Sequence, residues 1–287
     1  MKNIKMQFKE VKKMNYKLIV TDMDGTLLNS KQTVSQRNKD ALKKAQDMGI
    51  KVGIATGRIY TSAKYYAKLL GIQTPIIACN GAIIRDEVTG EEIYKNVLDK
   101  ENSFEIINLC ERYGVYYHFY DDKSFYCKRL GYSSLYYEKW NKTQPEENRV
   151  DIRVIKDGKE IINANVDPLK FLIIDEDINK LNDLMEELRQ IPTLEVSKSW
   201  KNNIEVMNKG VCKGLALKRL SQYLDIKREE IIALGDNYND LSMIEYAGMG
   251  VAMGNGEQIV KENSNYITKS NDEDGVAYAL ENLLNLT

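Results

Sequence analysis

Two carboxylates stand where a buried strand is predicted to end. Residues 18–20 are all apolar, and Asp22 and Asp24 follow them before the chain turns at Gly25. Side chains alternate along an extended chain, but the glycine breaks the strand, so both carboxylates can converge on one cleft. We therefore expect two aspartates that divide the labour of a reaction at the carboxyl end of a strand, where α/β sheets bind their ligands.

A second Asp-x-Asp-Gly sequence, Asp272–Gly275, provides an internal comparison. It follows no apolar strand, and a helical pattern begins directly after it at residue 276. We expect these acids to be solvated and to cap that helix. Neither copy is an EF-hand, because the third oxygen ligand and the terminal glutamate are missing.

A hydroxyl, a glycine and a cation follow another apolar run. Residues 52–55 form the predicted strand, and Thr56, Gly57 and Arg58 come directly after it. All three suit a phosphate, because the hydroxyl donates a hydrogen bond, the glycine lets the backbone approach, and the next helix presents its N-terminus. In the structural alternative, Thr56 caps the helix and Arg58 is a surface charge.

Lys213 stands at the start of a predicted helix whose apolar face runs through Leu217, Leu220 and Leu224. A lysine at a helix N-terminus opposes the helix dipole, so this position favours an anionic partner. An ordinary surface lysine is the alternative.

A further strand end carries acids four residues apart. The apolar run 231–234 leads into Gly235–Asp240, which contains Asp236 and Asp240. Hard oxygen ligands suit Mg²⁺, which needs only one or two protein carboxylates, so Asp22 and Asp236 would suffice. Asp240 by itself could instead cap the following helix.

The rest of the chemical inventory is narrow. His118 is the single histidine, which excludes mechanisms that need two imidazoles and leaves a Ser-His-Asp triad without support. The four cysteines, at positions 79, 110, 127 and 212, form no Cys-x-x-Cys pair, so we expect reduced thiols. Acidic residues must therefore carry the chemistry.

Apolar strand patterns alternate with amphipathic helices at both ends of the chain, which is typical of a parallel sheet covered on both faces. We predict an α/β fold with a doubly wound, mostly parallel, Rossmann-like sheet. Residues 15–84 and 198–287 would form this core. Residues 85–197 have a different pattern of predicted strands and helices and would form an inserted α+β domain.

Composition excludes several functions. The 287 residues carry 41 basic and 42 acidic side chains, so a formal charge of −1 gives no global attraction for nucleic acid or anionic lipid. No apolar stretch approaches the roughly 18 residues of a membrane span, and none resembles a secretory signal, so we expect a cytoplasmic protein. The basic leader 1–14 should be disordered rather than an anchoring amphipathic helix.

The order of these motifs resembles the haloacid dehalogenase-like superfamily. Its phosphatases share an Asp-x-Asp-Gly-Thr strand end, a threonine, a lysine and an acidic pair. The long insert, together with Cys79–Ala82 and Gly235–Asp240, resembles the Cof-type subfamily, which has a type IIB cap. The resemblance covers residues 15–286, and every motif position is filled.

The resemblance implies a Mg²⁺-dependent phosphatase that acts on small phosphomonoesters, such as sugar phosphates or related metabolites. Asp22 would be the nucleophile that forms an aspartyl-phosphate. Asp24 would be the acid toward the leaving alcohol and then the base toward water. Asp22, the Asp24 carbonyl and Asp236 would hold the metal.

The resemblance also implies a supporting set at the same edge of the sheet. Thr56 and Lys213 would steady the phosphoryl oxygens and the nucleophile. Asn80 and Gly81 would border the substrate. We also expect Gly57, Arg58 and Asn239 to bind it. Asn239 and Asp240 would support the metal and Lys213.

Two other functions remain open. A sugar phosphomutase shares this cap type but needs cap cations for a second phosphate, for which Arg129, Arg149 and Arg153 are candidates. A binding protein without turnover is the alternative of another class, although the intact Asp22 and Lys213 argue against it. The expected partner is a small phosphorylated metabolite, and the expected assembly is a monomer or a small homo-oligomer.

Selectivity is expected to reside in the inserted domain, because phosphate, metal and nucleophile occupy the core motifs. In the predicted strand 115–120, alternation puts Tyr116, His118 and Tyr120 on one face, which could face the cleft. We therefore expect His118 to touch the leaving group. A solvent-facing histidine is the alternative.

Overall fold

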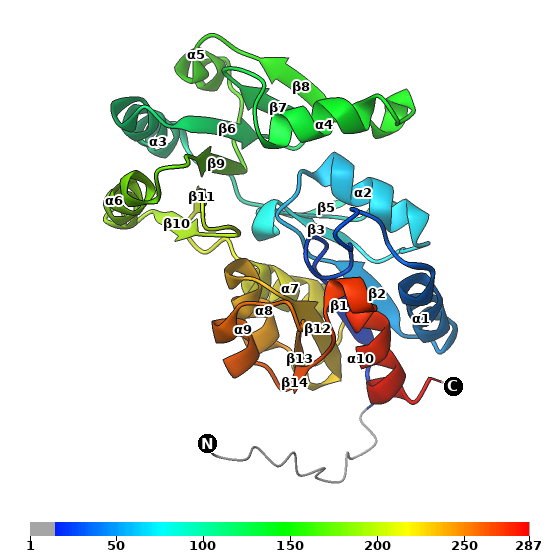
Figure 1. Cartoon of the computed structure of the whole chain (residues 1–287). Coiled ribbons are helices and arrows are strands. Elements are labelled where there is room, and N and C mark those ends of the chain that lie inside the picture. Colours follow the sequence, from blue (N-terminus) through cyan, green and yellow to red (C-terminus); the bar gives the residue numbers. More distant parts are fainter. Residues whose placement is uncertain (1–14, 287) are drawn as a thin grey trace, which may run out of the picture.

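The chain builds a lower part from its two ends and an upper part from its middle (Figure 1). The computed structural model describes residues 15–286, so the predicted leader 1–14 lies outside the described residues. No helix within the described range is long and apolar enough to cross a membrane.

The lower part centres on a five-stranded parallel sheet in the order β14-β13-β12-β1-β2. Its strands are β1 (Leu18–Thr21), β2 (Lys51–Ile54), β12 (Ile231–Gly235), β13 (Met249–Ala252) and β14 (Tyr266–Ile267). The central strand β1 pairs with β2 on one side and with β12 on the other, with Leu18 opposite Lys51 and Ile231. The carboxyl ends of β1, β2 and β12 therefore meet at one edge.

Alternating residues of this sheet pack against helices on both faces. Ile19 and Ile232 pack with α1 (Gln36–Asp47) and α10 (Gly275–Leu284), whereas Leu18 and Ile231 pack with α7 (Lys213–Tyr223) and α8 (Leu241–Tyr246). The remaining helices of this part are α2 (Tyr60–Leu69) and α9 (Gln258–Glu262). The predicted α/β class, a doubly wound parallel sheet with a separate inserted sheet, is confirmed.

A small antiparallel sheet continues the lower part. It contains β3 (Ile76–Ala78), β4 (Ile83–Arg85) and β5 (Glu92–Lys95). A parallel bridge between Ala55 and Ile77 links it to the chain just after β2. The loop after β3 is thereby held beside the loop after β2.

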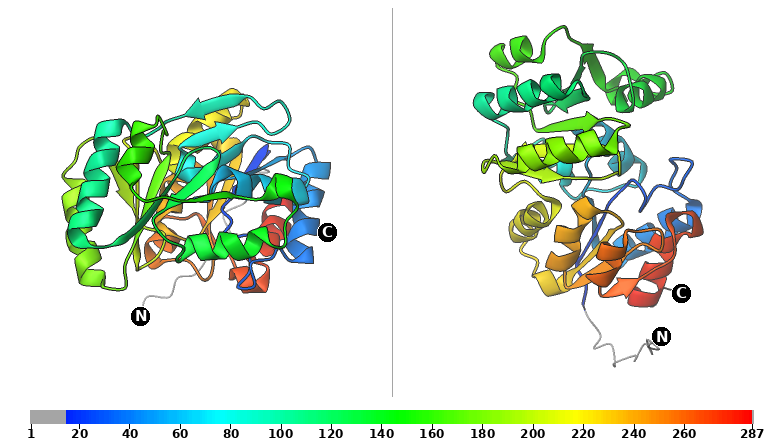
Figure 2. Two further views of the ribbon diagram at one scale, coloured as in Figure 1. Left: turned by 90° about the horizontal axis from the view of Figure 1, so that it is seen from above. Right: turned by 60° about the vertical axis from the view of Figure 1, so that its left-hand side comes forward.

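The upper part is a six-stranded mixed sheet in the order β10-β11-β9-β6-β7-β8. Its strands are β6 (Tyr116–Tyr120), β7 (Ser124–Cys127), β8 (Asp151–Val154), β9 (Lys170–Ile174), β10 (Leu194–Ser197) and β11 (Asn203–Asn208). We call this part the cap, and it stacks over the lower part, the core, as the right-hand view of Figure 2 shows.

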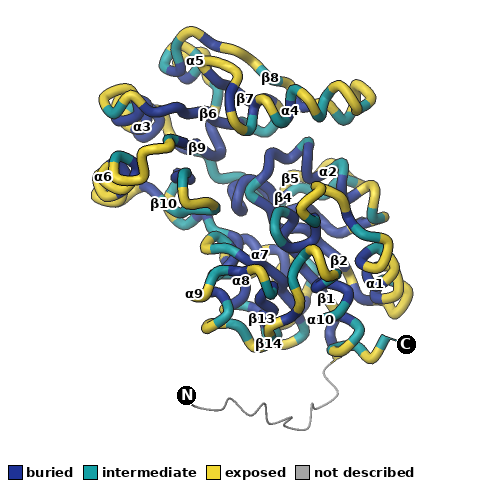
Figure 3. Tube along the Cα trace, in the orientation of Figure 1, coloured by how far each residue is buried: buried dark blue, intermediate teal, exposed yellow. Residues whose placement is uncertain are grey.

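Helices cover the two faces of the cap sheet unequally. The helices α3 (Lys100–Tyr113) and α6 (Ile178–Arg189) pack on one face with Tyr117 and Phe119, and α5 (Gly158–Asn163) adjoins α3. The helix α4 (Ser133–Asn141) packs through Tyr137 on the opposite side, next to Phe125. Strands of both parts are largely buried, while the outer helix faces are exposed (Figure 3).

Short 3-10 turns complete the architecture: η1 (Cys79–Gly81), η2 (Glu146–Asn148), η3 (Arg228–Glu230), η4 (Tyr238–Asp240) and η5 (Asn271–Glu273). All four cysteines are free, as expected, and three of them are buried.

Strand pairing places the junctions between core and cap later in the chain than the sequence-based boundaries of 85 and 197. The strand β5 pairs with β4 in the small core sheet, and β11 pairs with β9 in the cap sheet. The strands β5 and β11 each adjoin a crossing between the two parts, and their short patterns do not reveal which sheet they join. We propose junctions near residues 97 and 209.

Candidate active site

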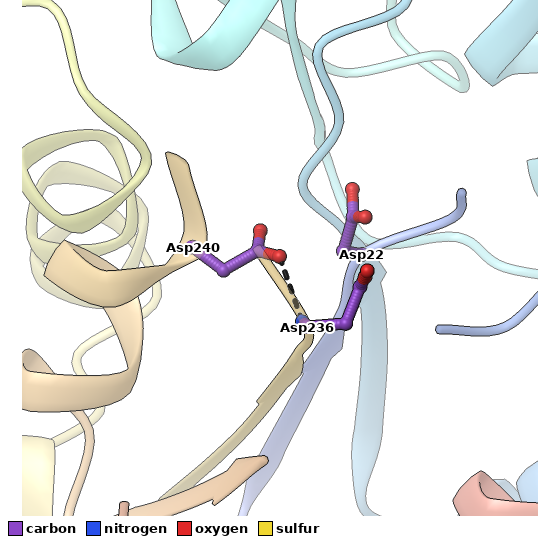
Figure 4. A group of neighbouring side chains, drawn as sticks. All are labelled: Asp22, Asp236 and Asp240. Carbon is purple, nitrogen blue, oxygen red and sulfur yellow. Dashed lines mark hydrogen bonds between the residues drawn. The ribbon is translucent and has the colours of Figure 1, made fainter. Parts of the chain in front are cut away.

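Three buried aspartates meet above the carboxyl edge of the core sheet. Asp22 follows β1, Asp236 follows β12, and Asp240 lies in η4. A carboxylate oxygen of each lies within 4.8 Å of the other two (Figure 4). Sequence reasoning placed these side chains at two strand ends, and the parallel pairing of β1 with β12 brings them together.

Lys213 joins two of these aspartates. Its Nζ donates to Asp22 Oδ1 at 2.7 Å and to Asp240 Oδ1 at 2.6 Å. The lysine is the first residue of α7 and is fully buried. A buried ammonium at a helix N-terminus is stable only beside anions, so the expectation of an anionic partner is confirmed and the surface lysine is not.

Asp240 uses both of its oxygens within the protein. Its Oδ2 accepts from the backbone N–H of Asp236 at 2.9 Å and of Asn237 at 3.0 Å, while Oδ1 faces Lys213. Asp240 does occupy the N-cap position of α8, but its side chain makes no capping hydrogen bond to that helix. Asp240 therefore orients Lys213 and the loop after β12.

Crowding of carboxylates perturbs their protonation. Burial and the neighbouring Asp240 charge raise the pKa of Asp22 well above its usual range, although Lys213 opposes the shift. Burial and Asp240 likewise raise the pKa of Asp236 to about 7. Both shifts have the same cause, namely burial together with repulsion between neighbouring carboxylates.

The donor set fits a hard divalent cation. Asp22 and Asp236 supply carboxylate oxygens, and one oxygen of Asp236 is oriented by Thr26, whose Oγ1 donates to Oδ1 at 2.8 Å. Gly25 lies so close to Asp236 that a Cβ at this position would collide with the carboxylate. Oxygen ligands of this kind are those that Mg²⁺ prefers.

Arg58 binds Asp24, the second acid of the first motif. Its guanidinium also donates to Gln32 Oε1 at 2.6 Å, and only 8% of the Arg58 side chain is exposed. The surface-charge alternative for Arg58 is therefore wrong. Because Asp24, Gln32 and Arg58 itself line the same cavity, the arginine belongs to the site.

The loop after β2 differs in part from expectation. Thr56 is fully buried, and its Oγ1 accepts from the backbone N–H of Arg58 at 3.1 Å. The helix α2 has Ile59 at its N-cap, so Thr56 does not cap it. Gly57 lines the cavity, where the backbone N–H groups of this loop can approach an anion.

Asn80 and Asn239 lie beside that loop. Asn239 Nδ2 donates to Asn80 Oδ1 at 3.2 Å, and Asn239 lines the cavity. Asn80 is buried and donates to Glu205 Oε2 at 2.7 Å. Gly81 packs against Cys212 and Ala216 at the start of α7, so it supports the site without bordering the cavity.

A cavity of about 450 Å³ opens above the aspartates, between core and cap. Asp22, Asp24 and Asp236 lie among its core residues, and cap residues complete it. The cap side is rich in aromatic and neutral polar side chains, namely Tyr120, Tyr132, Tyr136, Tyr137, Trp200, Asn202 and Asn203.

The structure does not bring His118 to this cavity. It shares the core-facing side of β6 with Tyr120, as predicted, but it is fully buried. Its ring stacks on Phe125 at 4.3 Å, and Nε2 meets the Tyr120 hydroxyl at 3.1 Å. Direct contact with a leaving group and exposure to solvent are both wrong, because neighbouring rings cover the histidine.

Two buried charged residues of the site lie outside the motifs identified in the sequence. Lys170 in β9 and Glu205 in β11 line the cavity from the cap side. Lys170 is the single polar residue of β9, and Glu205 is the single charge of β11, between Ile204 and Val206. A lone charge beside apolar strand residues is a signal that the sequence contains.

Comparison with known proteins agrees with this geometry. The sequence model of haloacid dehalogenase-like hydrolases matches residues 19–280. The chain belongs to this family. It is 35% identical to phosphatase YwpJ of Bacillus subtilis (strain 168), with 93% of this chain and 100% of the relative covered. The family resemblance inferred from the motifs is confirmed, and the protein is a phosphatase enzyme.

Two further relatives are informative. The chain is 34% identical to the 5-amino-6-(5-phospho-D-ribitylamino)uracil phosphatase YwtE of B. subtilis (strain 168), covering 93% of this chain and 98% of the relative. The solved structure of the subclass IIB sugar phosphatase BT4131 superposes with a TM-score of 0.77 at 25% identity, covering 94% of this chain and 100% of the other.

Proposed function

We propose that this phosphatase hydrolyses small phosphomonoesters with Mg²⁺ through an aspartyl-phosphate on Asp22. The observation that carries the proposal is the contact of Lys213 with both Asp22 and Asp240, at 2.7 and 2.6 Å, beside Asp236. One ammonium holds the proposed nucleophile in place while one Asp22 oxygen remains available for attack.

The first step forms one bond and breaks one. An Asp22 carboxylate oxygen attacks phosphorus, the bond from phosphorus to the ester oxygen breaks, and Asp24 gives its proton to the leaving alcohol. In the second step Asp24 takes a proton from water, which attacks the phosphorus, and the Asp22–phosphorus bond breaks. Inorganic phosphate and free Asp22 result.

The core residues around Asp22 supply the remaining support. The Gly57 backbone borders the phosphoryl group, and the buried Thr56 hydroxyl fixes that loop. Lys213 offsets the negative charge of the phosphoryl oxygens and of Asp22. Mg²⁺ held by Asp22 and Asp236, with the Asp24 carbonyl, would neutralise the acids and the phosphate.

The cap side of the cavity favours an uncharged polar leaving group. Two cations line the cavity, Arg58 and Lys170, and each is already paired with a carboxylate. The neutral amide of Asn202 can bind hydroxyls or amides, whereas the amide of Asn203 is already bonded to Ser199 and Trp200. Sugar phosphates fit this chemistry, as do phosphorylated metabolites of the kind named for YwtE.

A phosphomutase is less well supported. The three cap arginines considered for a second phosphate do not line the cavity among the described residues. Arg153 pairs with Asp151 at 2.8 Å, Arg129 lies over the Tyr116 ring, and Arg149 donates to a backbone carbonyl.

Phosphate release tests the proposal. The full chain should release phosphate from p-nitrophenyl phosphate and from members of a panel of sugar phosphates and other phosphorylated metabolites. Activity should vanish with chelator and return with Mg²⁺. Conversion of a sugar bisphosphate without phosphate release would favour the mutase, and phosphate binding without any turnover would favour a binding protein.

A further inference from the structure

A buried ion pair in the cap has no part in the chemistry described above. Lys170 of β9 and Glu205 of β11 meet at 2.7 Å, with 2% and 3% of their side chains exposed. Removing two charges from water costs free energy, which is recovered only with good geometry and further hydrogen bonds. The further hydrogen bonds of Lys170 and Glu205 therefore indicate which groups the pair positions.

Both side chains reach out of the cap to the core. Lys170 Nζ donates to the backbone carbonyl of Gly57 at 2.8 Å. Glu205 Oε2 accepts from Asn80 Nδ2 at 2.7 Å, and Asn80 Oδ1 in turn accepts from Asn239 Nδ2 at 3.2 Å. One ion pair thus touches the loop after β2 directly, and through Asn80 it reaches the loops after β3 and β12.

The packing at Gly57 is too tight for a side chain. A Cβ at this position would lie 2.8 Å from Asn80 Oδ1 and 3.2 Å from Lys170 Nζ. A side chain at this position would displace the Asn80 amide or the Lys170 ammonium, so the glycine leaves room for both contacts. Within that loop, the hydrogen bond of Lys170 Nζ goes to the Gly57 carbonyl oxygen.

We propose that the Lys170–Glu205 pair is a positioning device that fixes the phosphate-binding loop at Thr56 and Gly57 when the cap is seated. Lys170 holds the Gly57 carbonyl, and Glu205 holds Asn80, which in turn contacts Asn239. Phosphate affinity thereby depends on the cap, although the phosphate itself binds in the core. This inference rests on the proposed function.

A pair that only stabilised the cap fold would behave differently. Its loss would lower the melting temperature but would leave the affinity for phosphate unchanged, because phosphate touches only the core. Inorganic phosphate has no leaving group, so its binding isolates the effect on the loop.

Calorimetric binding of inorganic phosphate to the Mg²⁺-loaded full chain is the test, at a temperature where each variant is folded. The variants are Lys170→Met, which keeps the length of the side chain, and Glu205→Gln, which is nearly isosteric and can still accept from Asn80. The matched control is Lys128→Met, which breaks the exposed cap pair with Glu111 (2.6 Å).

We expect phosphate to bind about tenfold more weakly in both variants, and kcat/KM for p-nitrophenyl phosphate to fall at least as much, with the control unchanged. The double variant should be no worse than Lys170→Met alone, because both act through one contact. If Lys170→Met does not fold, Glu205→Gln carries the test.

Unchanged phosphate affinity in a folded variant would overturn the inference, even if its melting temperature had dropped. A wild-type protein that binds phosphate but hydrolyses no ester would instead contradict the proposed function and leave the binding result to decide this inference.

Discussion

Arg58 binds both carboxylate oxygens of Asp24, with Nε to Oδ2 at 2.7 Å and Nη2 to Oδ1 at 2.6 Å. Burial alone would disfavour the charged form of Asp24, but the Arg58 charge and hydrogen bonds outweigh it and lower the pKa of Asp24. Paired in this way, Asp24 is a carboxylate, the form that a general base requires. To act as the proposed general acid, Asp24 must first bind a proton, and this protonation competes with its ion pair with Arg58.

Removing the guanidinium should shift the pH dependence. In Arg58→Met the pKa of Asp24 should rise, so its protonated form should persist to higher pH. For an alkyl phosphate, the decline of kcat/KM toward alkaline pH should therefore begin at a higher pH than in the wild type. Arg37→Met, which breaks the more exposed two-point contact with Glu281, is the control. Identical profiles would separate Arg58 from the titration of Asp24.

Asp24→Asn should impair poor leaving groups most. General acid assistance contributes about 10²- to 10⁴-fold, and a basic alkoxide needs it far more than p-nitrophenolate does. Hydrolysis rates should be compared for an alkyl phosphate and p-nitrophenyl phosphate. Asp274→Asn, the equivalent change in the second Asp-x-Asp-Gly sequence, should affect neither. Equal losses on both substrates would count against the acid role.

Asp22→Asn should abolish turnover with the fold intact, because an amide of the same shape cannot attack phosphorus. Circular dichroism should match the wild type, and phosphate release should fall to background. Fluoroberyllate should be trapped on Asp22 in the wild type alone. Asp272→Asn provides the matched control at an exposed position. Residual activity well above background in Asp22→Asn would show that another group is the nucleophile.

Without metal, the free energy of unfolding should fall as pH rises from about 4 to 7. Burial and Asp240 raise the pKa of Asp236 to about 7, so in this range the folded protein keeps a proton that the unfolded chain has lost. Melting temperatures in chelator at pH 5 and pH 8 measure the effect. Mg²⁺ should restore stability at pH 8, and Asp236→Asn should flatten the dependence. A variant slope equal to that of the wild type would refute the assignment to Asp236.

Leaving-group selectivity should follow Trp200 rather than His118. Trp200 lies in the loop between β10 and β11, lines the cavity and is 68% exposed. Trp200→Ala should change the ratio of kcat/KM among larger substrates about tenfold, roughly 1.4 kcal/mol, with little effect on acetyl phosphate. His118→Ala should instead lower stability by about 2 kcal/mol, because it leaves a cavity beside Phe125. A selectivity change in His118→Ala without loss of stability would reverse these roles.

The core of the site could be predicted because its side chains follow buried strands. Apolar runs before Asp22, Thr56 and Asp236 identify strand ends, and parallel pairing brings those ends to one edge. The unfavourable place of a lysine at a helix N-terminus predicted an anionic partner for Lys213, and the structure provides two carboxylates.

The cap was less predictable because its contacts depend on how two sheets face each other. Strand alternation gave the correct face for His118 but could not reveal that Phe125 and Tyr120 cover it. Lys170 and Glu205 come from strands of one sheet and find their partners in the other part of the molecule. No local pattern specifies such a contact.

The position of β1 at the centre of the core sheet has a consequence for folding. Leu18 begins a strand whose neighbour on one side starts at Ile231, near the other end of the chain. Contacts between segments so distant form slowly, and during synthesis β12 leaves the ribosome only after the whole cap segment. The cap can therefore fold first, before Asp236 has been synthesised and can join Asp22 at the site. A nascent chain that stops before residue 236 contains every strand of the cap sheet but not Asp236, so we expect it to lack the proposed metal site.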